Sequence, residues 1–544
     1  MKNIYTEDMK EITTSSSILK ELITYDMVYV DKTSYIWRMV KNPARNFYFI
    51  SRPRRFGKSL FCDTLKNVFE GNKELFKGLY IYDKYDFKPY PVLHFDFNNM
   101  DANSIEDFIK GLKGKIILQA EEVGIDIDSS YGPAMMFEML IERLYRRDGE
   151  IVIIQDEYDA PLTSAAIGDP EMSEGVRKAL NSFYATIKNK AGMIRFCFIT
   201  GVVKLSNLSI FSAMNNLVDL SMDKEFSGAF GYTDEELEEY FGEGIDEFLE
   251  ANPGVYESRE EFREKIRDYY DGYRFSPESE TRVYNPVSIG FFFYKHCEFD
   301  NYWEVTGVSA LAVKLARKSK LIDIMKEENT LFEKSSFINF DISEIGNDNI
   351  AVSSVIALLY YSGYLTIQEI SEMDDNVYLL GFPNVEIKCT FTENLINRFT
   401  GFAGIRSTWL MKFRTACYNG DEKEAESCIR DYFAAFPYDV FPTGKEKNYQ
   451  IVFNAIFVLL SIPNDFEKKT FRGRIDTAVK AGKHYWIFEL KIDRSADEAL
   501  SQIEEKEYAE TFTYLKDNGI AIHKVGISIS SADRQIAEWK CIDA

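Results

Sequence analysis

Short apolar runs alternate with helix-like segments through the first 200 residues. Four of the runs have the length and composition of buried strands, at 47–50, 91–97, 151–154 and 194–199. Between them, segments such as 59–69 and 105–122 repeat apolar residues at the spacing of an amphipathic helix. Strands that alternate with helices favour a parallel sheet covered by helices on both faces. We therefore predict an α/β domain over residues 1–232.

The middle of the chain has a different pattern. Residues 233–265 contain 13 Asp or Glu against 3 Lys or Arg, which is typical of a solvated helical lid. Residues 300–400 are mostly helical and end in strand-like pieces at 363–367 and 377–380. This order predicts a small winged-helix-like unit. The lid and this unit together make up a predicted middle region over 233–400.

The C-terminal part forms a second α/β pattern. A helical segment after residue 401 is followed by two strand signals on either side of a turn at 481–484. A helix at 496–511 and a strand at 524–529 close the pattern. We predict a separate α/β domain over 401–544.

Charge is distributed unevenly along the chain. The 544 residues contain 64 Lys or Arg and 87 Asp or Glu, a formal net charge of −23. Residues 1–400 carry −21 of this charge and residues 401–544 only −2. A protein this acidic is not a general nucleic-acid coat, because phosphates would repel it. Only the C-terminal part could lie against a phosphate backbone at modest electrostatic cost.

The cysteines and the hydropathy pattern favour a cytoplasmic protein. The seven cysteines include no CxxC pair and the chain has only four histidines, so a structural zinc site is not expected. The N-terminal residues lack the apolar core of a signal peptide, and no apolar stretch is long enough to span a bilayer. We expect no membrane association.

A basic, glycine-containing loop lies between the first predicted strand and its helix. It reads SRPRRFGKS, and it has the order strand, loop, helix that a P-loop requires. Gly57 allows close backbone approach, Lys58 can reach the β- and γ-phosphates, and Ser59 can ligate Mg²⁺. Arg55 can contact phosphates, with a solvated loop residue as the alternative. The pattern departs from GxxxxGK[ST], because Arg52 occupies the first glycine position.

An acidic pair follows the predicted strand at 151–154. A carboxylate just beyond a buried parallel strand can hold Mg²⁺ beside a P-loop, and we assign this role to Asp156. Glu157 is then placed to polarise the attacking water as a general base. Thr200, directly after the fourth strand, is a candidate γ-phosphate sensor. A threonine that only caps the strand before Gly201 is an equally good interpretation.

A second cluster of chemically suitable residues lies near the C-terminus. Asp476 precedes the turn at 481–484, and Glu489 and Lys491 follow it on one face of a strand. If the turn folds the two strands together, Asp476 and Glu489 converge on one Mg²⁺ or Mn²⁺ ion, with Lys491 beside them. The cation shields phosphodiester charge, and Lys491 orients the water or stabilises the transition state. A hairpin with solvated charges is the alternative.

Two helical residues could complete this cluster. Glu446 is a candidate additional metal ligand, and Gln502 is a candidate contact to the phosphate backbone. Either could simply be an exposed helix residue.

Several motifs along the chain resemble the bacterial AAA-ATPase-like family, whose members are commonly fused to a C-terminal PD-(D/E)XK nuclease-superfamily domain. The residues that carry the resemblance are 29–33 (YVDKT), 52–59 (RPRRFGKS), 156–159 (DEYD), 200–204 (TGVVK), 270–273 (YDGY), 284–286 (YNP), 380–384 (LGFPN) and the pattern of Asp476, Glu489 and Lys491. The resemblance covers nearly the whole chain. It implies P-loop nucleotide binding, a restriction-endonuclease-like C-terminal domain, and an arginine at position 52 as a family feature.

These observations predict an ATPase whose nucleotide state controls a metal-dependent nuclease-like domain acting on nucleic acid, DNA rather than RNA. ATP and Mg²⁺ are the expected cofactors, and homo-oligomerisation is expected because AAA-type sites often borrow an arginine from a neighbouring subunit. The alternative is a nucleotide-switched interaction or signalling protein with a non-cleaving nuclease-like domain. The acidic surface favours that alternative, and the intact pattern of Asp476, Glu489 and Lys491 favours the enzyme.

Overall fold

The computed structural model describes most of the chain. The described residues are 10, 12, 16–42, 44, 46–98, 100, 104–168, 170–205, 217–303, 331–338, 340, 351–371, 374–391, 407–434, 449, 453, 464–470, 473–506, 519–533 and 535–543. The chain divides into two compact units, Met1–Ile387 and Lys388–Ala544, and each is described by itself. The finer division of the first unit at residue 232 remains a prediction.

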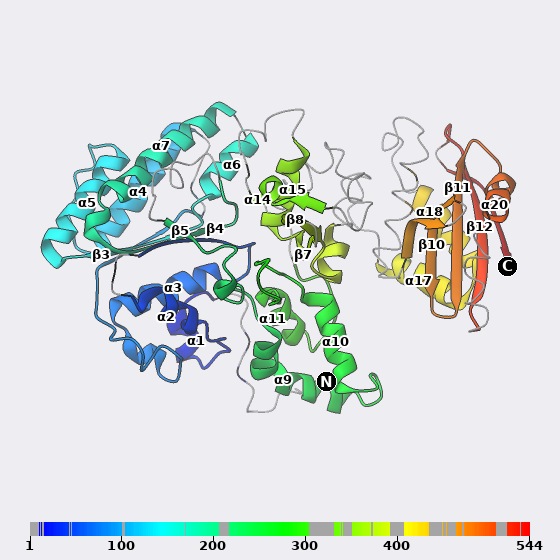
Figure 1. The fold of residues 1–544 in the computed structure, drawn as a ribbon, viewed down its shortest axis with the longest axis horizontal. Helices are drawn as coiled ribbons and strands as arrows, with labels where there is room; N and C mark the ends of the chain where they lie inside the picture. Colours follow the sequence, from blue (N-terminus) through cyan, green and yellow to red (C-terminus); the bar gives the residue numbers. More distant parts are fainter. Residues whose placement is uncertain are drawn as a thin grey trace. The chain divides into compact units, whose positions relative to one another are not determined.

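A five-stranded parallel sheet organises the first unit (Figure 1). Its strands are β1 (Asn46–Ser51), β2 (Val92–Asp96), β3 (Ile151–Asp156), β4 (Ile194–Gly201) and β5 (Leu217–Asp219). They lie in the order β2-β3-β4-β1-β5, and each adjacent pair is parallel. The predicted parallel sheet is confirmed. The end of β4 lies between the end of β1, which leads into the basic loop, and the end of β3, which carries the acidic pair.

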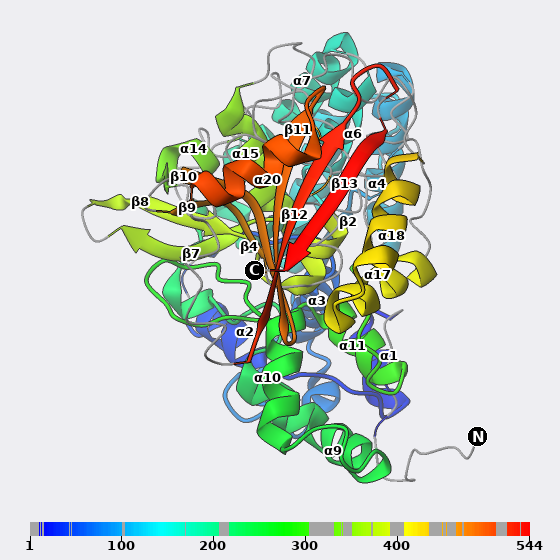
Figure 2. The same ribbon diagram turned by 90° about the vertical axis from the view of Figure 1, so that its right-hand side faces the viewer.

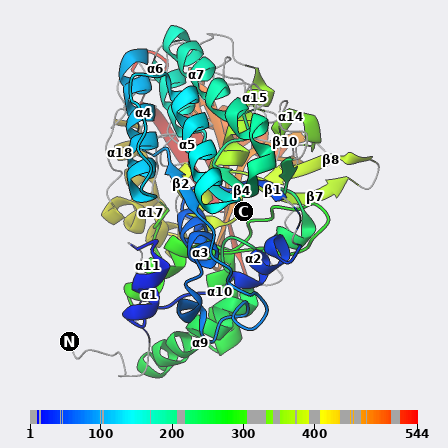
Figure 3. The same ribbon diagram turned by 90° about the vertical axis from the view of Figure 1, so that its left-hand side faces the viewer.

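Helices cover both faces of this sheet, as predicted. Figures 1 and 3 show one group of helices packed together on one face and another helix on the opposite face. The group consists of α4 (Ile105–Glu122), α5 (Pro133–Asp148) and α7 (Pro170–Asn189), and the opposite helix is α3 (Lys58–Glu70). Phe61, Leu65 and Phe69 bury one side of α3. This packing positions the N-terminus of α3 at the carboxyl edge of the sheet, where α/β proteins bind ligands.

Two helices that cover the acidic region, and a third that follows it, pack around an apolar core. They are α9 (Asp234–Ala251), α10 (Arg259–Tyr270) and α11 (Pro286–Tyr294). The first begins with a capping box, in which the Thr233 hydroxyl accepts from Glu236 N and the Glu236 carboxylate accepts from Thr233 N. Glu236 also pairs with the Lys32 ammonium at 2.5 Å, and Lys32 donates to Gly228 O at 2.8 Å. The helices are therefore tied to the segment that precedes β1.

The described residues between 331 and 381 form a small antiparallel sheet with two helices. Its elements are β6 (Leu331–Glu333), α14 (Lys334–Ile338), α15 (Val352–Ser362), β7 (Thr366–Ser371) and β8 (Asp374–Gly381). The strand order is β6-β8-β7, and β7 and β8 form a hairpin that follows the helices. This arrangement is winged-helix-like, as the sequence predicted.

The second unit is built on a five-stranded mixed sheet (Figure 2). Its strands are β9 (Asn464–Thr470), β10 (Gly473–Ala481), β11 (His484–Ile492), β12 (Ala521–Ile529) and β13 (Ile536–Asp543), in the order β13-β12-β11-β10-β9. Strands β11 and β12 are parallel and the other pairs are antiparallel. The segment that joins the two parallel strands contains α20 (Ala496–Glu505).

Each face of the β11 strand packs against a different layer. Trp486, Phe488 and Leu490 belong to the core formed with α17 (Ser407–Asn419) and α18 (Glu422–Ala434). Tyr485 and Ile487 pack with Leu500 and Ile503 of α20 on the opposite face. The alternation predicted for this strand is confirmed, and Glu489 and Lys491 lie on the α20 side. The mixed sheet between helical layers is the restriction-endonuclease-like α/β domain that the sequence predicted.

None of the seven cysteines, all of which lie in the described ranges, forms a disulfide, and six of them are buried. Among the helices of the described ranges, none combines the length and the apolar composition needed to cross a bilayer.

Candidate nucleotide and metal sites

The loop between β1 and α3 turns around two left-handed residues. Arg55 has a φ of +68° and Gly57 a φ of +86°. This conformation is costly for most residues and free for glycine, and a side chain at position 57 would meet no other atom within 4 Å. Gly57 is therefore required for its backbone angles. The turn brings Gly57 and the first residues of α3 to the wall of a cavity of about 400 Å³. Helix N-termini attract phosphate groups in such a position.

The Lys58 ammonium lies inside the loop, next to the cavity. Its Nζ donates to the carbonyl oxygens of Arg52 and Pro53, at 3.2 Å each. It also lies 3.5 Å from Glu157 Oε1, and the Lys58 side chain is 3% exposed. The ammonium is thus held at the cavity wall by oxygen atoms that phosphate oxygens could replace.

Ser59 and Asp156 are in direct contact. The Ser59 hydroxyl donates to Asp156 Oδ2 at 2.6 Å, and Asp156 Oδ1 accepts from the Glu157 N–H at 2.9 Å. Burial and the neighbouring charge of Glu157 raise the pKa of the Asp156 carboxyl to about 6. Two adjacent oxygen donors in a site that disfavours uncompensated negative charge suit a hard divalent cation. These two residues fit the Mg²⁺ ligands predicted from the sequence.

Glu157 has a strained backbone that the ends of two strands hold in place. Its φ is +49°, and the next residue, Tyr158, donates its N–H to Thr200 O and its hydroxyl to Val203 O. The Asp159 carboxylate accepts from the N–H groups of Val202 and Val203, at 3.0 and 2.9 Å. Strain of this kind persists only where the surroundings over-determine it. Here it turns the Glu157 side chain into the wall of the 400 Å³ cavity.

Thr200 and Arg55 differ in their access to this cavity. Arg55 lines it. Thr200 is fully buried, and its hydroxyl donates to Ile50 O at 2.8 Å across the β1–β4 pair. This hydrogen bond is the one that a structural threonine at a strand end makes, so the geometry favours that alternative over a γ-phosphate sensor.

Arg52 has a structural position that explains the missing glycine. Its guanidinium is 1% exposed and donates to the carbonyl oxygens of Ser51, Ser221 and Phe226. It also stacks over the Phe275 ring at 4.2 Å. The side chain therefore ties the base of the loop to the segment after β5, and it does not line the nucleotide cavity.

Sequence reasoning gave no role to several other residues that line or shape the nucleotide cavity. Tyr29, Lys32 and Tyr232 line it, and Asp159 fixes its acidic edge. Tyr29, Lys32 and Asp159 belong to motifs that carry the family resemblance, which was the available signal. Lys32 bonds to Glu236, 204 residues away, and Asp159 to Val203, 44 residues away, so both partners are beyond the reach of local patterns.

The second unit brings Asp476 and Glu489 together by strand pairing. Thr477 pairs with Phe488 in the antiparallel β10–β11 ladder, and this register places Asp476 opposite Glu489. Asp476 Oδ2 accepts from the Leu490 N–H at 2.9 Å. Lys491 Nζ donates to Glu489 Oε1 at 3.0 Å. The hairpin expected from the turn at 481–484 therefore brings the side chains of Asp476, Glu489 and Lys491 together.

Glu489 is fully buried, and one of its oxygens is free to accept a ligand. Its Oε1 accepts from Lys491 and from the Gln502 amide, whereas Oε2 has no hydrogen-bond partner among the described residues. Burial and the charge of Asp476 raise the pKa of the Glu489 carboxyl to about 8. A buried carboxylate with an unused oxygen beside a second carboxylate fits a divalent cation. Gln502 contacts Glu489 directly, which sequence reasoning did not foresee.

The metal-ligand sets are small within the described part of the chain. No group of three or more His, Cys, Asp or Glu side chains there could hold a metal ion by itself. Each proposed site would thus offer two side-chain oxygen donors, and substrate or water oxygens would complete the coordination. Glu446, the predicted additional ligand, lies outside the described residues.

A parallel sheet with a lysine-containing loop after β1 and an acidic pair after β3 defines a P-loop NTPase, here joined to a restriction-endonuclease-like unit. Comparisons with known proteins agree. Residues 15–211 match the model of the family described as "Predicted AAA-ATPase", and residues 444–539 match that of the PD-(D/E)XK nuclease superfamily. The chain belongs to this AAA-ATPase-like family and has a C-terminal PD-(D/E)XK nuclease-superfamily domain.

A relative and two solved structures are similar over most of the chain. "Uncharacterized protein in vnfD 5'region" from Azotobacter chroococcum mcd 1 is 30% identical over 520 residues, 94% of each chain. The Aeropyrum pernix ORC2 protein (13% identity, TM-score 0.27) covers 94% of this chain and 99% of its own. Cdc6p from Pyrobaculum aerophilum (11% identity, TM-score 0.24) covers 73% and 98%. Both scores are too low for a shared fold to be inferred from them.

Proposed function

We propose that the protein is a Mg²⁺-dependent ATPase whose nucleotide state controls a metal-dependent nuclease acting on nucleic acid, DNA rather than RNA. The observation that carries the ATPase is the contact of Ser59 with Asp156 beside Lys58 and Glu157 at one cavity. The nuclease is supported by the convergence of Asp476, Glu489 and Lys491. Cysteines that form no disulfide among the described residues support a reducing, cytoplasmic location.

At the nucleotide site, each residue has a separate task. Lys58 exchanges its contacts to the Arg52 and Pro53 carbonyls for the β- and γ-phosphates, and the N–H groups at the start of α3 bind phosphate oxygens. Ser59 and Asp156 would hold Mg²⁺, which neutralises phosphate charge when bound. Release of Lys58 toward the phosphates frees the Glu157 carboxylate to take a proton from the attacking water.

At the nuclease site, Asp476 and Glu489 would hold a divalent cation through oxygen donors. A cation bound there would supply positive charge that shields the phosphodiester. Lys491 is held 3.0 Å from Glu489 Oε1, so its ammonium can orient the water or stabilise charge in the transition state. Gln502 keeps the Glu489 carboxylate in one orientation.

The ATPase assignment is tested with two substitutions and one control. Lys58→Ala should weaken ATP binding by a factor of about 100 or more, because a buried phosphate-binding cation is lost. Glu157→Gln should retain binding and slow hydrolysis by a factor of about 100 or more, because the amide accepts no proton. Lys66→Ala removes a lysine of the same helix that pairs with Glu122 instead, and it should behave as wild type. Wild-type turnover in Lys58→Ala would refute the assignment.

The nuclease assignment is tested with DNA and RNA substrates in Mg²⁺ or Mn²⁺. Asp476→Asn and Glu489→Gln should each abolish cleavage while ATP hydrolysis persists, because the ATPase residues lie in another sheet. Asp493→Asn is the matched control, since that exposed carboxylate lies just after β11 and accepts from the Ser531 N–H and hydroxyl. Equal cleavage by all three variants would assign the activity to another site or to a contaminant. Cleavage of RNA alone would contradict the preference for DNA.

Nucleotide control is a separate claim with its own measurement. Cleavage is compared for wild type without nucleotide, with ADP and with ATP, and for Glu157→Gln held in the ATP state. An identical cleavage rate in all four conditions would refute nucleotide control without refuting the ATPase or the nuclease assignment. Light scattering on the same samples tests ATP-dependent homo-oligomerisation, which would supply an arginine to the transition state. A strict monomer that still hydrolyses ATP would contradict it.

The second candidate is a nucleotide-switched binding protein without nuclease activity. The net charge of −23, which disfavours contact with phosphate backbones, is the observation in its favour. Absence of cleavage by wild type across DNA and RNA, with either metal and with ATP, would select this candidate.

A further inference from the structure

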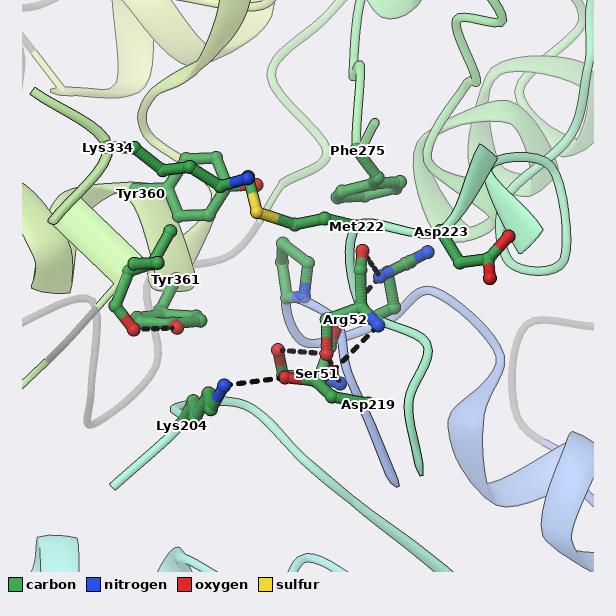
Figure 4. A pocket seen from close by; sticks show the side chains of 13 residues that line it. Ser51, Arg52, Lys204, Asp219, Met222, Asp223, Phe275, Lys334, Tyr360 and Tyr361 are labelled. Carbon is green, nitrogen blue, oxygen red and sulfur yellow. Dashed lines mark hydrogen bonds and ion pairs between the residues drawn. The ribbon is translucent and has the colours of Figure 1, made fainter. Parts of the chain in front are cut away.

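A second cavity lies beside the phosphate loop, outside the carboxyl ends of β1 and β5 (Figure 4). Its volume is about 350 Å³, and all of its lining residues belong to the first unit. The two cavities share the loop but not its residues. Arg52 and Pro53 line the second cavity, whereas Arg55 to Ser59 line the nucleotide cavity. Open α/β sheets bind ligands at this edge, so the position itself suits a small molecule.

The wall of this cavity contains three basic and two acidic residues, so basic residues are in excess. Arg52 lies at its base, is 1% exposed, and donates to three backbone carbonyls. Burial lowers the pKa of this guanidinium to about 10, which reflects the cost of a buried cation. Lys204 pairs with Asp219 at 2.6 Å, so these two charges cancel.

The two remaining charged residues act differently. The Asp223 carboxylate accepts from Glu225 N at 2.7 Å and caps a short helical turn, and Figure 4 shows it directed away from the cavity. Lys334, at the start of α14, extends over the opening beside Tyr360 and has no ion pair among the described residues. Arg52 and Lys334 therefore leave a net positive field inside a region of the chain that is otherwise strongly acidic.

The rest of the lining is apolar or aromatic. Met222, Phe275 and Tyr360 surround the space between the two cations (Figure 4). An ordinary phosphate ion would satisfy the charge and leave this surface in contact with water. An anionic group on a compact apolar or aromatic body would satisfy both.

We propose that this cavity binds a small organic anion, with its phosphate or carboxylate at Lys334 above Arg52 and its ring against Met222, Phe275 and Tyr360. The ligand would contact the loop base, the segment after β5 and the winged-helix-like region at once. Because the same loop continues into the nucleotide cavity, occupancy of one cavity changes affinity at the other, and the effect is reciprocal. This site would make the ATPase responsive to a metabolite.

The test uses the full chain and separates the two cavities by substitution. Isothermal titration measures binding of AMP, UMP, salicylate and inorganic phosphate to wild type, Lys58→Ala and Lys334→Glu. At least one organic anion should bind wild type and Lys58→Ala alike, bind Lys334→Glu at least tenfold more weakly, and bind more tightly than phosphate. Tighter binding of AMP or UMP would indicate a phosphate ligand, and tighter binding of salicylate would indicate a carboxylate ligand.

Controls address charge and folding. Lys295→Glu makes the same change of charge at an exposed lysine after α11 and should not alter binding. Lys334→Arg should retain binding, and Lys334→Gln gives a neutral variant if the acidic one fails to fold. Unchanged ATP affinity in Lys334→Glu shows that the first unit is intact.

Three results would overturn the proposal. They are no binding of any organic anion to wild type, equal binding to wild type and Lys334→Glu, or loss of binding in Lys58→Ala. The last result would place the probes in the nucleotide cavity. Failure of ATP to bind wild type would refute the ATPase without affecting the anion measurement, so the two proposals fail separately.

Discussion

Replacing Arg52 by glycine would restore the first glycine of the usual P-loop pattern, and the structure predicts that it destabilises the protein. The guanidinium joins the Ser51, Ser221 and Phe226 carbonyls at 2.8, 2.8 and 3.1 Å. It also lies 4.2 Å from the centre of the Phe275 ring. Glycine would leave three carbonyl groups without this donor and would open a cavity under the loop.

These contacts give the expected loss in the free energy of unfolding. Three net hydrogen bonds at about 1 kcal/mol each, a cation–π contact of about 1 kcal/mol and roughly 0.5 kcal/mol of glycine entropy would sum to between 4 and 5 kcal/mol. Relief of the buried charge offsets part of this, so we expect about 4 kcal/mol. With roughly 2.1 cal/mol/K of unfolding entropy per residue and 387 residues in the unit, the melting temperature falls by about 5 °C. Arg52→Lys should lose about half as much.

Differential scanning calorimetry of the full chain provides the measurement. Trp486→Phe removes an indole hydrogen bond to Cys417 O and identifies the transition of the second unit. Arg55→Gly is the matched control in the same loop, because its φ of +68° suits glycine. It should stay within about 1 kcal/mol of wild type. An unchanged or higher melting temperature in Arg52→Gly, or a loss of ATP binding without any loss of stability, would refute the structural role of Arg52.

Three other predictions follow from buried contacts in the first unit. Burial raises the pKa of Glu386 from 4.5 to about 8, so the folded state holds this proton more tightly than the unfolded chain. The contribution of Glu386 to stability therefore declines as pH rises from 4.5 to 8. In denaturant titrations, the free energy of unfolding of Glu386→Gln should rise by roughly 3 kcal/mol relative to wild type between pH 5 and pH 8. A difference between the two proteins that does not change with pH would contradict this. Gly201→Ala would place a methyl group against Asp159 Oδ1 and the Tyr158 ring, and it should cost roughly 3 kcal/mol and slow ATP hydrolysis. Gly192→Ala, which meets no atom within 4 Å, is its control in both assays, and equal behaviour of the two variants would disprove the clash. Glu236→Gln should weaken the bond to Lys32 and lower the melting temperature by about 1–3 °C, whereas exposed Glu235→Gln should have no effect.

The repeated patterns of the sequence determined the local structure of both units. Apolar runs predicted β1 to β4, and the alternation along 484–492 predicted which residues of β11 share a face. Such patterns are local, because the period of a strand or helix depends only on neighbouring residues. The P-loop could be predicted for the same reason, from a GKS sequence between a strand and a helix. The acidic pair after β3 could likewise be predicted from its position at the end of an apolar run. The strand β5 has only three residues and left no comparable pattern.

Only the tertiary structure decided which distant residues meet. In the sequence, Arg52 is a departure from the usual P-loop motif. The structure explains it, because the Arg52 guanidinium donates to backbone carbonyls about 170 residues away. For Thr200 the sequence allowed a phosphate sensor or a strand-end residue, and the hydrogen bond from its hydroxyl to Ile50 O favours the second. The second cavity is lined by residues from six separate stretches of chain, so no local sequence pattern predicts it. Hydrogen bonds and burial join residues by position in space, and spacing along the sequence carries that information only within a helix, a strand or a turn.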